Sequence, residues 1–206
     1  MGTRHIVEVI RKGKPVIRQY GQWDGYAATA GYTLRNFIKE NGKERLNEIL
    51  DKVDPIDNIT HGNEPDMLIT DKAHILESMM TSFDKEIAEY RDKIKSMGIF
   101  DIDMHIALVP ILVEKFGFDR TAKYYTLTRD TGYKVLDVLN MLYSIKECRD
   151  GETNIPVYIE GDLDTGRKIV INIDDETFTC KYFDKEKTWT FDKLPTLSEL
   201  KKVDKW

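Results

Sequence analysis

Cysteine is scarce in this sequence of 206 residues, and this scarcity excludes two kinds of protein. Cys148 and Cys180 are the two cysteines and form no Cys-x-x-Cys pair, so the sequence encodes neither a disulfide framework nor a thiolate zinc site. We expect both thiols to be reduced and packed in the interior.

Long apolar runs are also missing. No segment approaches the roughly 18 apolar residues of a membrane span. The opening MGTRHIVEVIRKG has neither the apolar core nor the small-residue cleavage site of a secretory signal. The sequence therefore predicts a cytoplasmic protein without a membrane partner.

Positive charge does not reach the level expected of a protein that binds nucleic acid through its phosphates. Lys and Arg number 31 against 36 Asp and Glu, which gives a formal net charge of -5. Such binders usually carry a basic excess or a basic stripe, so we do not expect nucleic acid to be the partner.

Four common catalytic or nucleotide-binding motifs are absent: Gly-x-Gly-x-x-Gly, Gly-x-x-x-x-Gly-Lys, Gly-x-Ser-x-Gly and His-Glu-x-x-His. Asp101, Asp103 and His105 alternate and can in principle ligate a metal, but we favour a helix cap at this position. We therefore expect neither a metal nor a cofactor.

Extended segments at both ends of the chain flank a helical middle. His5–Ile10 and Pro15–Tyr20 form a predicted hairpin around Gly13. Four further strands are expected after Gly151, at 157–159, 168–173, 177–183 and 189–191. These patterns predict one α+β domain spanning 1–206, in which the hairpin and the C-terminal strands form a single antiparallel sheet packed by the helical segment.

Apolar spacing and helix signals place the helices between these strands. Thr33 is the expected cap of a first helix, and Gly42 is expected to end or bend it. An exposed loop is predicted from Asp54 to Thr70. Further helices are expected at 102–116, around Pro110, at 133–145 and at 197–203.

The strongest helical period is a stripe from Leu76 to Met97. Its steps alternate between four and three residues, which keeps one apolar face aligned along a helix. We favour packing in the core of the same chain. The alternative is a contact with a second copy of the chain or with a host protein.

The first candidate site is the segment Tyr20-Gly21-Gln22-Trp23-Asp24-Gly25-Tyr26, directly after a predicted strand. Its rings can stack on a flat ligand while Gln22 and Asp24 orient the ligand by hydrogen bonds. The alternative is a structural loop in which Trp23 and Tyr26 fold over the edge of the core.

The second candidate site is the segment Thr128-Arg129-Asp130-Thr131-Gly132, before the helix at 133–145. Asp130 or Thr131 can cap that helix, and its free amides together with Arg129 can bind an anion. The alternative is a plain cap with an ion pair between Arg129 and an Asp. Arg4 is a third cation for the same region, or a partner of Asp24.

These segments resemble a family of uncharacterised proteins found largely in tailed bacteriophages and bacteria, with related fungal proteins. The resemblance rests on the opening MGTRH, on YGQWDGY at 20–26, on TRDTG from Thr128 and on IDDETF at 173–178. The family usually continues Tyr-Pro with a Gly-rich stretch, whereas Ala27-Ala28-Thr29-Ala30 follows here. The resemblance implies a phage or prophage origin, and so the host cytoplasm, but no established activity.

Three functions are compatible with these residues. We favour a non-catalytic binder of a small anionic, nucleotide-like ligand, with a counter-defence role in an infected host. The second is a protein-interaction or oligomerising subunit that uses the Leu76–Met97 helix. The third is an N-terminal-nucleophile hydrolase, which the layered architecture permits but the opening disfavours, because removal of Met1 leaves Gly2 at the terminus. Whether the protein catalyses a reaction is left open, and binding without catalysis is the function that we favour.

Overall fold

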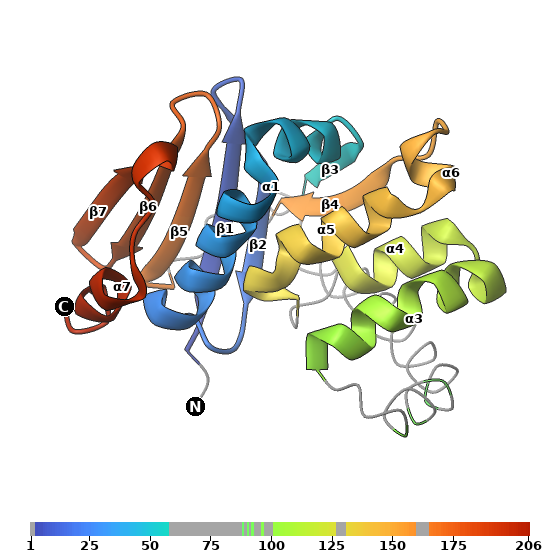
Figure 1. The fold of residues 1–206 in the computed structure, drawn as a ribbon, viewed down its shortest axis with the longest axis horizontal. Coiled ribbons are helices and arrows are strands. Elements are labelled where there is room, and N and C mark those ends of the chain that lie inside the picture. The colour runs from blue at the N-terminus through green and yellow to red at the C-terminus, as the bar shows by residue number, and fades with distance from the viewer. Residues whose placement is uncertain are drawn as a thin grey trace, which may run out of the picture.

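The computed structural model of the protein describes residues 3–57, 101–126, 131–159 and 165–206, together with Ala88, Tyr90, Asp92 and Ser96. In these residues a central mixed sheet has helices packed against it (Figure 1). Its seven strands follow the order β3-β4-β2-β1-β5-β6-β7. Their bounds are β1 His5–Arg11, β2 Lys14–Gly21, β3 Val53–Asp57, β4 Ile155–Ile159, β5 Arg167–Asn172, β6 Thr177–Tyr182 and β7 Lys185–Thr190.

The N-terminal hairpin forms the middle of the sheet. His5 to Val9 are five consecutive buried residues of β1, so both faces of this strand are covered, as is usual for a central strand. The α+β class is confirmed, as is the joining of the hairpin to the C-terminal strands in one sheet. Within β2-β1-β5-β6-β7, three pairs are antiparallel and β1–β5 is parallel. Strand β4 runs parallel to β2 and therefore ends where β1 begins, and β5, which starts from that end, runs parallel to β1.

At one edge of the sheet, the structure differs from the exposed loop that the sequence predicts from Asp54. Val53–Asp57 is instead strand β3, which pairs in parallel with β4. Pro55 lacks a backbone N–H but is tolerated because β3 lies at the edge of the sheet. The rest of that predicted loop lies outside the described residues.

Helical segments occupy most of the described chain between the strands. Their bounds are the π-helical turn η1 Ala27–Gly31, α1 Tyr32–Leu50, α3 Asp101–Phe116, α4 Phe118–Thr126, the 3-10 turn η2 Gly132–Lys134, α5 Val135–Ser144, α6 Lys146–Arg149, the 3-10 turn η3 Phe191–Lys193 and α7 Leu197–Val203. The helices α1, α5 and α7 lie on one face of the sheet (Figure 1). The expected helices at 102–116, 133–145 and 197–203 are confirmed, with Pro110 inside α3, whereas α4 was not predicted.

Helix α1 differs from the prediction at its start. Thr33 is not its cap, because the chain enters α1 from η1 with Gly31 at the cap position and no side-chain cap bond. Gly42 does bend the helix, since its φ of 75° and ψ of 176° are not helical. Leu46, Ile49 and Leu50 continue the buried face beyond the bend.

A single hydrophobic cluster joins the sheet to the helices. It includes Val7 and Val9 of β1, Phe178 of β6 and Leu34 of α1. The stripe at 76–97 falls almost entirely outside the described residues. Tyr90, its one described member, is half-buried and packs against this cluster.

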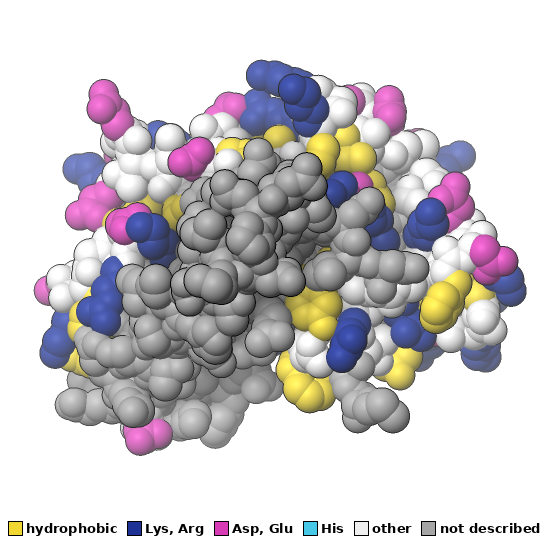
Figure 2. Space-filling model, turned by 180° about the vertical axis from the view of Figure 1, so that it is seen from behind, with side chains coloured by type: hydrophobic (Ala, Val, Ile, Leu, Met, Phe, Trp, Pro, Cys, Tyr) yellow, Lys and Arg dark blue, Asp and Glu magenta, His cyan; other side chains and the backbone are white. Residues whose placement is uncertain are grey.

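Charges of both signs are interspersed on the described part of the face seen from behind (Figure 2). In the same described ranges, no helix has the length and apolar character required to cross a membrane. Cys148 and Cys180 are free and buried, as expected.

Candidate functional site

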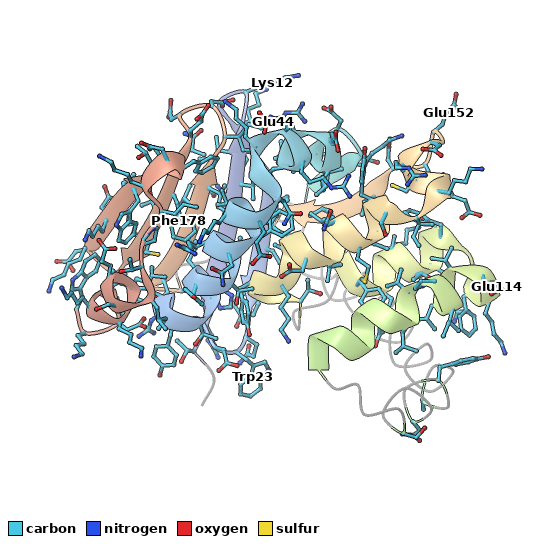
Figure 3. The ribbon with its side chains drawn as sticks, in the orientation of Figure 1. Lys12, Trp23, Glu44, Glu114, Glu152 and Phe178 are labelled. Atoms are coloured by element: carbon cyan, nitrogen blue, oxygen red, sulfur yellow. The ribbon has the colours of Figure 1, made fainter. Side chains whose placement is uncertain are left out.

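The aromatic loop at residues 21–26 leaves β2 at the end of the sheet where β1 begins. Trp23 lies there, at the opposite end of the molecule from Lys12 (Figure 3). Three contacts hold the loop and the turn that follows it. The Gly25 amide donates to the Thr3 carbonyl at 3.0 Å, and the Tyr182 hydroxyl donates to the Gly25 carbonyl at 2.8 Å. The Asp204 carboxylate accepts from the amides of Ala27 at 2.6 Å and Ala28 at 2.9 Å.

The imidazole of His5 is the centre around which this loop is built. His5 is 0% exposed, and its ring packs 5.8 Å from the ring of Tyr133. A Cβ on Gly21 would lie 2.1 Å from Cε1 of His5, and one on Gly25 would lie 2.7 Å from its Nδ1. Glycine is therefore needed at both positions because the imidazole occupies the space of a side chain.

Gly132 forms the third wall of this cage. A Cβ there would lie 3.0 Å from Cα of Gly21 and 3.4 Å from Cε1 of His5, and its φ of 45° also favours glycine. The opening, the aromatic loop and the end of the TRDTG segment thus meet around His5, although they are far apart in the sequence.

Burial lowers the pKa of His5 from 6.5 to about 4, against smaller opposing effects of the Thr3 backbone and of Asp24. Neither ring nitrogen makes a hydrogen bond of good geometry in the described part of the chain. His5 is therefore neutral at pH 7 and shielded from solvent. It acts as a structural residue, since a general base must reach its substrate.

The aromatic side chains of the loop remain open to solvent although its backbone is held. Trp23 is 56% exposed and Tyr26 is 45% exposed. Asp24 is also exposed and has a positive φ of 54°. Gln22 is half-buried and accepts a hydrogen bond from the Tyr20 hydroxyl at 2.6 Å. These exposures argue against the alternative in which Trp23 and Tyr26 fold over the edge of the core.

The second predicted segment is only partly described. Arg129 and Asp130 lie outside the described residues, so their approach to the aromatic loop stays a prediction. Thr131 is buried and its hydroxyl donates to the Tyr125 carbonyl, so its side chain makes no cap bond. Thr131 occupies the N-cap position of η2, through which the chain enters α5, but it does not form the predicted side-chain cap.

Arg4 is exposed at the same end of the sheet. The predicted pairing with Asp24 is not formed, because no ion pair within 4.0 Å joins them among the described salt bridges. Both side chains are exposed to solvent.

Arg167 is a cation at this site that the sequence reasoning missed. Its Cζ lies 5.5 Å from the ring centroid of Tyr26, 5.2 Å from that of Tyr182 and 5.9 Å from that of Phe183. Phe183 is 67% exposed. The contact depends on strand pairing: Arg167 stands opposite Tyr182 in the β5–β6 ladder, and this places it beside Tyr182 and the following Phe183.

The described residues bring exposed aromatic rings and positive charge to this end of the sheet. Trp23, Tyr26 and Phe183 offer exposed rings, while Arg4 and Arg167 offer positive charge. In the part of the chain that the structure describes, no group of three or more His, Cys, Asp or Glu side chains is placed to hold a metal. Comparisons with protein-family models, curated proteins and solved structures found no match to this chain.

Proposed function

We propose that the chain is a non-catalytic binder of a small anionic, nucleotide-like ligand, which stacks on the aromatic loop at residues 21–26. The exposure of Trp23 and Tyr26 on a loop with an anchored backbone is the observation that carries the proposal. Large apolar rings exposed together on a soluble protein commonly mark a contact surface.

The anchoring matters for affinity. A mobile loop loses conformational entropy when a ligand orders it, whereas this loop is already tied to Thr3, Tyr182 and Asp204. Stacking of a base on an aromatic side chain contributes about 1–3 kcal/mol. Positive charge from Arg4 and Arg167 adds the attraction for an anion that the rings alone lack.

The proposal is tested by titrating the protein with purine and pyrimidine nucleoside monophosphates and following tryptophan fluorescence and heat. The loop variants Trp23→Ala and Tyr26→Ala are expected to weaken binding about tenfold or more, with little change in melting temperature because both rings are exposed. Tyr143→Ala is the control, since that ring packs against Arg45, at 4.3 Å, away from the loop. Absence of binding to the wild-type protein, or equal affinity in all variants, would contradict the proposal.

A counter-defence role in a phage-infected host rests on the sequence resemblance alone and remains part of the same proposal. It would follow if the bound ligand were a host signalling nucleotide. The interaction subunit built on 76–97 and the N-terminal-nucleophile hydrolase remain the two alternative functions, because most of the stripe, and Gly2, lie outside the described residues.

A further inference from the structure

We infer that Arg167 is the anion-binding residue of this site and that the ligand is a nucleoside phosphate whose phosphate contacts the Arg167 guanidinium. This inference rests on the proposed function. It adds a residue from β5, far in sequence from the aromatic loop, and assigns the anionic part of the ligand to it.

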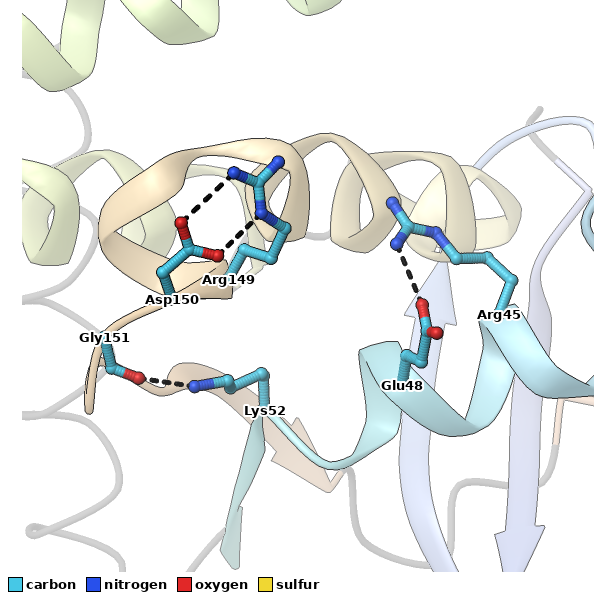
Figure 4. A network of polar contacts seen from close by, with 6 residues as sticks. All are labelled: Arg45, Glu48, Lys52, Arg149, Asp150 and Gly151. Atoms are coloured by element: carbon cyan, nitrogen blue, oxygen red, sulfur yellow. Dashed lines mark hydrogen bonds and ion pairs between the residues drawn. The ribbon is translucent and has the colours of Figure 1, made fainter.

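The surroundings of Arg167 differ from those of Arg18, Arg45 and Arg149, which each pair with a carboxylate. Arg18 pairs with Glu8 at 2.7 Å, and Arg149 pairs with Asp150 at 2.8 Å. Arg45 pairs with Glu48 at 3.1 Å, at a distant surface that also holds Arg149 (Figure 4). Arg167 contacts three rings and forms no ion pair within the described residues.

Among the residues that the structure describes, no carboxylate forms an ion pair with Arg167. Nε of Arg167 is buried without a hydrogen-bond partner in the described part of the protein. A ring can attract a guanidinium, by about 0.5–1 kcal/mol at an exposed site, but it does not cancel the charge. An oxyanion would cancel it, and a planar guanidinium binds phosphate through two parallel hydrogen bonds.

The local backbone holds this arrangement in place. Thr165 Oγ1 donates to the Arg167 carbonyl at 2.7 Å. Gly166 has a φ of 66°, and a Cβ there would lie 2.5 Å from Cε1 of Phe183. Glycine at 166 therefore lets the Phe183 ring lie against the backbone directly before Arg167, where it flanks the guanidinium.

The position of Arg167 fits a ligand that combines a ring with a phosphate. The Tyr26 ring is shared, because it belongs to the aromatic loop and also lies 5.5 Å from Arg167 Cζ. A phosphate on Arg167 thus places the attached base within reach of exposed rings. The net charge of -5 and the mixed surface charges favour a mononucleotide over a nucleic-acid strand, which would need many cations along its path.

The test compares Arg167→Gln with the matched control Arg149→Gln, since both remove one positive charge but Arg149 lies elsewhere, paired with Asp150. Affinities for a nucleoside, its monophosphate and a short single-stranded oligonucleotide are measured by calorimetry. We expect Arg167→Gln to weaken monophosphate binding about tenfold or more and to leave nucleoside binding within about twofold. Arg149→Gln should match the wild type for all three probes.

One result overturns the inference without touching the proposed function: an Arg167→Gln variant that binds the monophosphate as tightly as Arg149→Gln does, while Trp23→Ala still weakens binding. An oligonucleotide that binds while the monophosphate does not overturns the inference and the proposed small ligand together. If the wild-type protein binds none of the probes, both the inference and the proposed function fail.

Folding of Arg167→Gln is checked by its melting temperature. If that variant does not fold, Arg167→Lys decides the question, because lysine keeps the charge but loses the planar pair of donors. A loss of monophosphate affinity in Arg167→Lys with unchanged nucleoside affinity supports the inference. Unchanged affinity for both probes overturns it.

Discussion

Acid should destabilise this protein through His5, and the size of the effect follows from the burial of its ring. The pKa of His5 is 6.5 in an unfolded chain and about 4 in the folded protein, where burial disfavours the charged form. As the pH falls, the unfolded chain binds this proton first, so the stability present above pH 6.5 is lost progressively toward pH 4.

Lowering the pKa of His5 from 6.5 to about 4 corresponds to a total of about 3 kcal/mol of folding stability, at about 1.4 kcal/mol for each pKa unit. Roughly 2 kcal/mol of this should be lost between about pH 7.5 and about pH 4.5. The close approach of Gly21 and Gly25 to the ring is part of the burial that causes this shift.

The assay is urea unfolding of the wild-type protein and of His5→Leu at both pH values. Leucine is similar in size to histidine but does not titrate, so groups common to both proteins cancel in the difference. We expect the wild type to lose about 2 kcal/mol more than the variant on acidification. Parallel losses in the two proteins would refute the reasoning, since they would mean that the imidazole keeps its ordinary pKa in the fold.

Three further predictions use the same unfolding assay. Gly21→Ala should destabilise the protein by about 2–3 kcal/mol, because the added methyl group collides with the imidazole of His5. In the double variant, His5→Ala should recover part of that loss. Purely additive losses in the double variant would count against the cage. Burial, followed by the charge of Glu40, raises the pKa of Asp137 to about 6. Asp137→Asn should therefore raise the free energy of unfolding at neutral pH by about 1–2 kcal/mol, after allowance for partial exposure, and this gain should vanish at about pH 4. A gain that persists in acid would argue against this cause. Thr196→Ala should cost about 1 kcal/mol, because Thr196 caps α7 in a capping box with Glu199; an unchanged denaturation midpoint would mean that the cap contributes little.

Periodicity predicted the elements that are regular within themselves. The alternation of Phe178, Cys180 and Tyr182 marked β6, and the spacing of Leu34, Phe37 and Ile38 marked α1. Such patterns depend only on residues within the element itself, so they can be recognised in a single sequence.

Elements whose signals conflict, or whose partners lie far away, were missed. Strand β3 carries Pro55 and two aspartates, which argue against a strand until the edge position and the pairing with β4 are known. The parallel β1–β5 pair joins residues about 160 positions apart, and no local pattern encodes that direction.

The residues of the candidate site likewise include some that a local sequence pattern predicted and one that it missed. Trp23 and Tyr26 were predicted from one short segment, and the structure leaves both rings exposed. Arg167 was missed because it meets Tyr26 only after β5 has paired with β1 on one side and β6 on the other. A site assembled by sheet topology is not visible in local sequence.

The cage around His5 separates two kinds of residue within the segments on which the family resemblance rests. Gly21, Gly25 and Gly132 are required by packing, because a side chain at any of them would crowd the imidazole or the neighbouring backbone. Trp23 gains little from packing, since more than half of its surface faces solvent and its removal would open no cavity in the core. A large ring exposed on a loop that is itself rigidly built points to a contact made outside the chain. In the proposed function, the glycines therefore support the site, and the exposed rings together with Arg167 would contact the ligand.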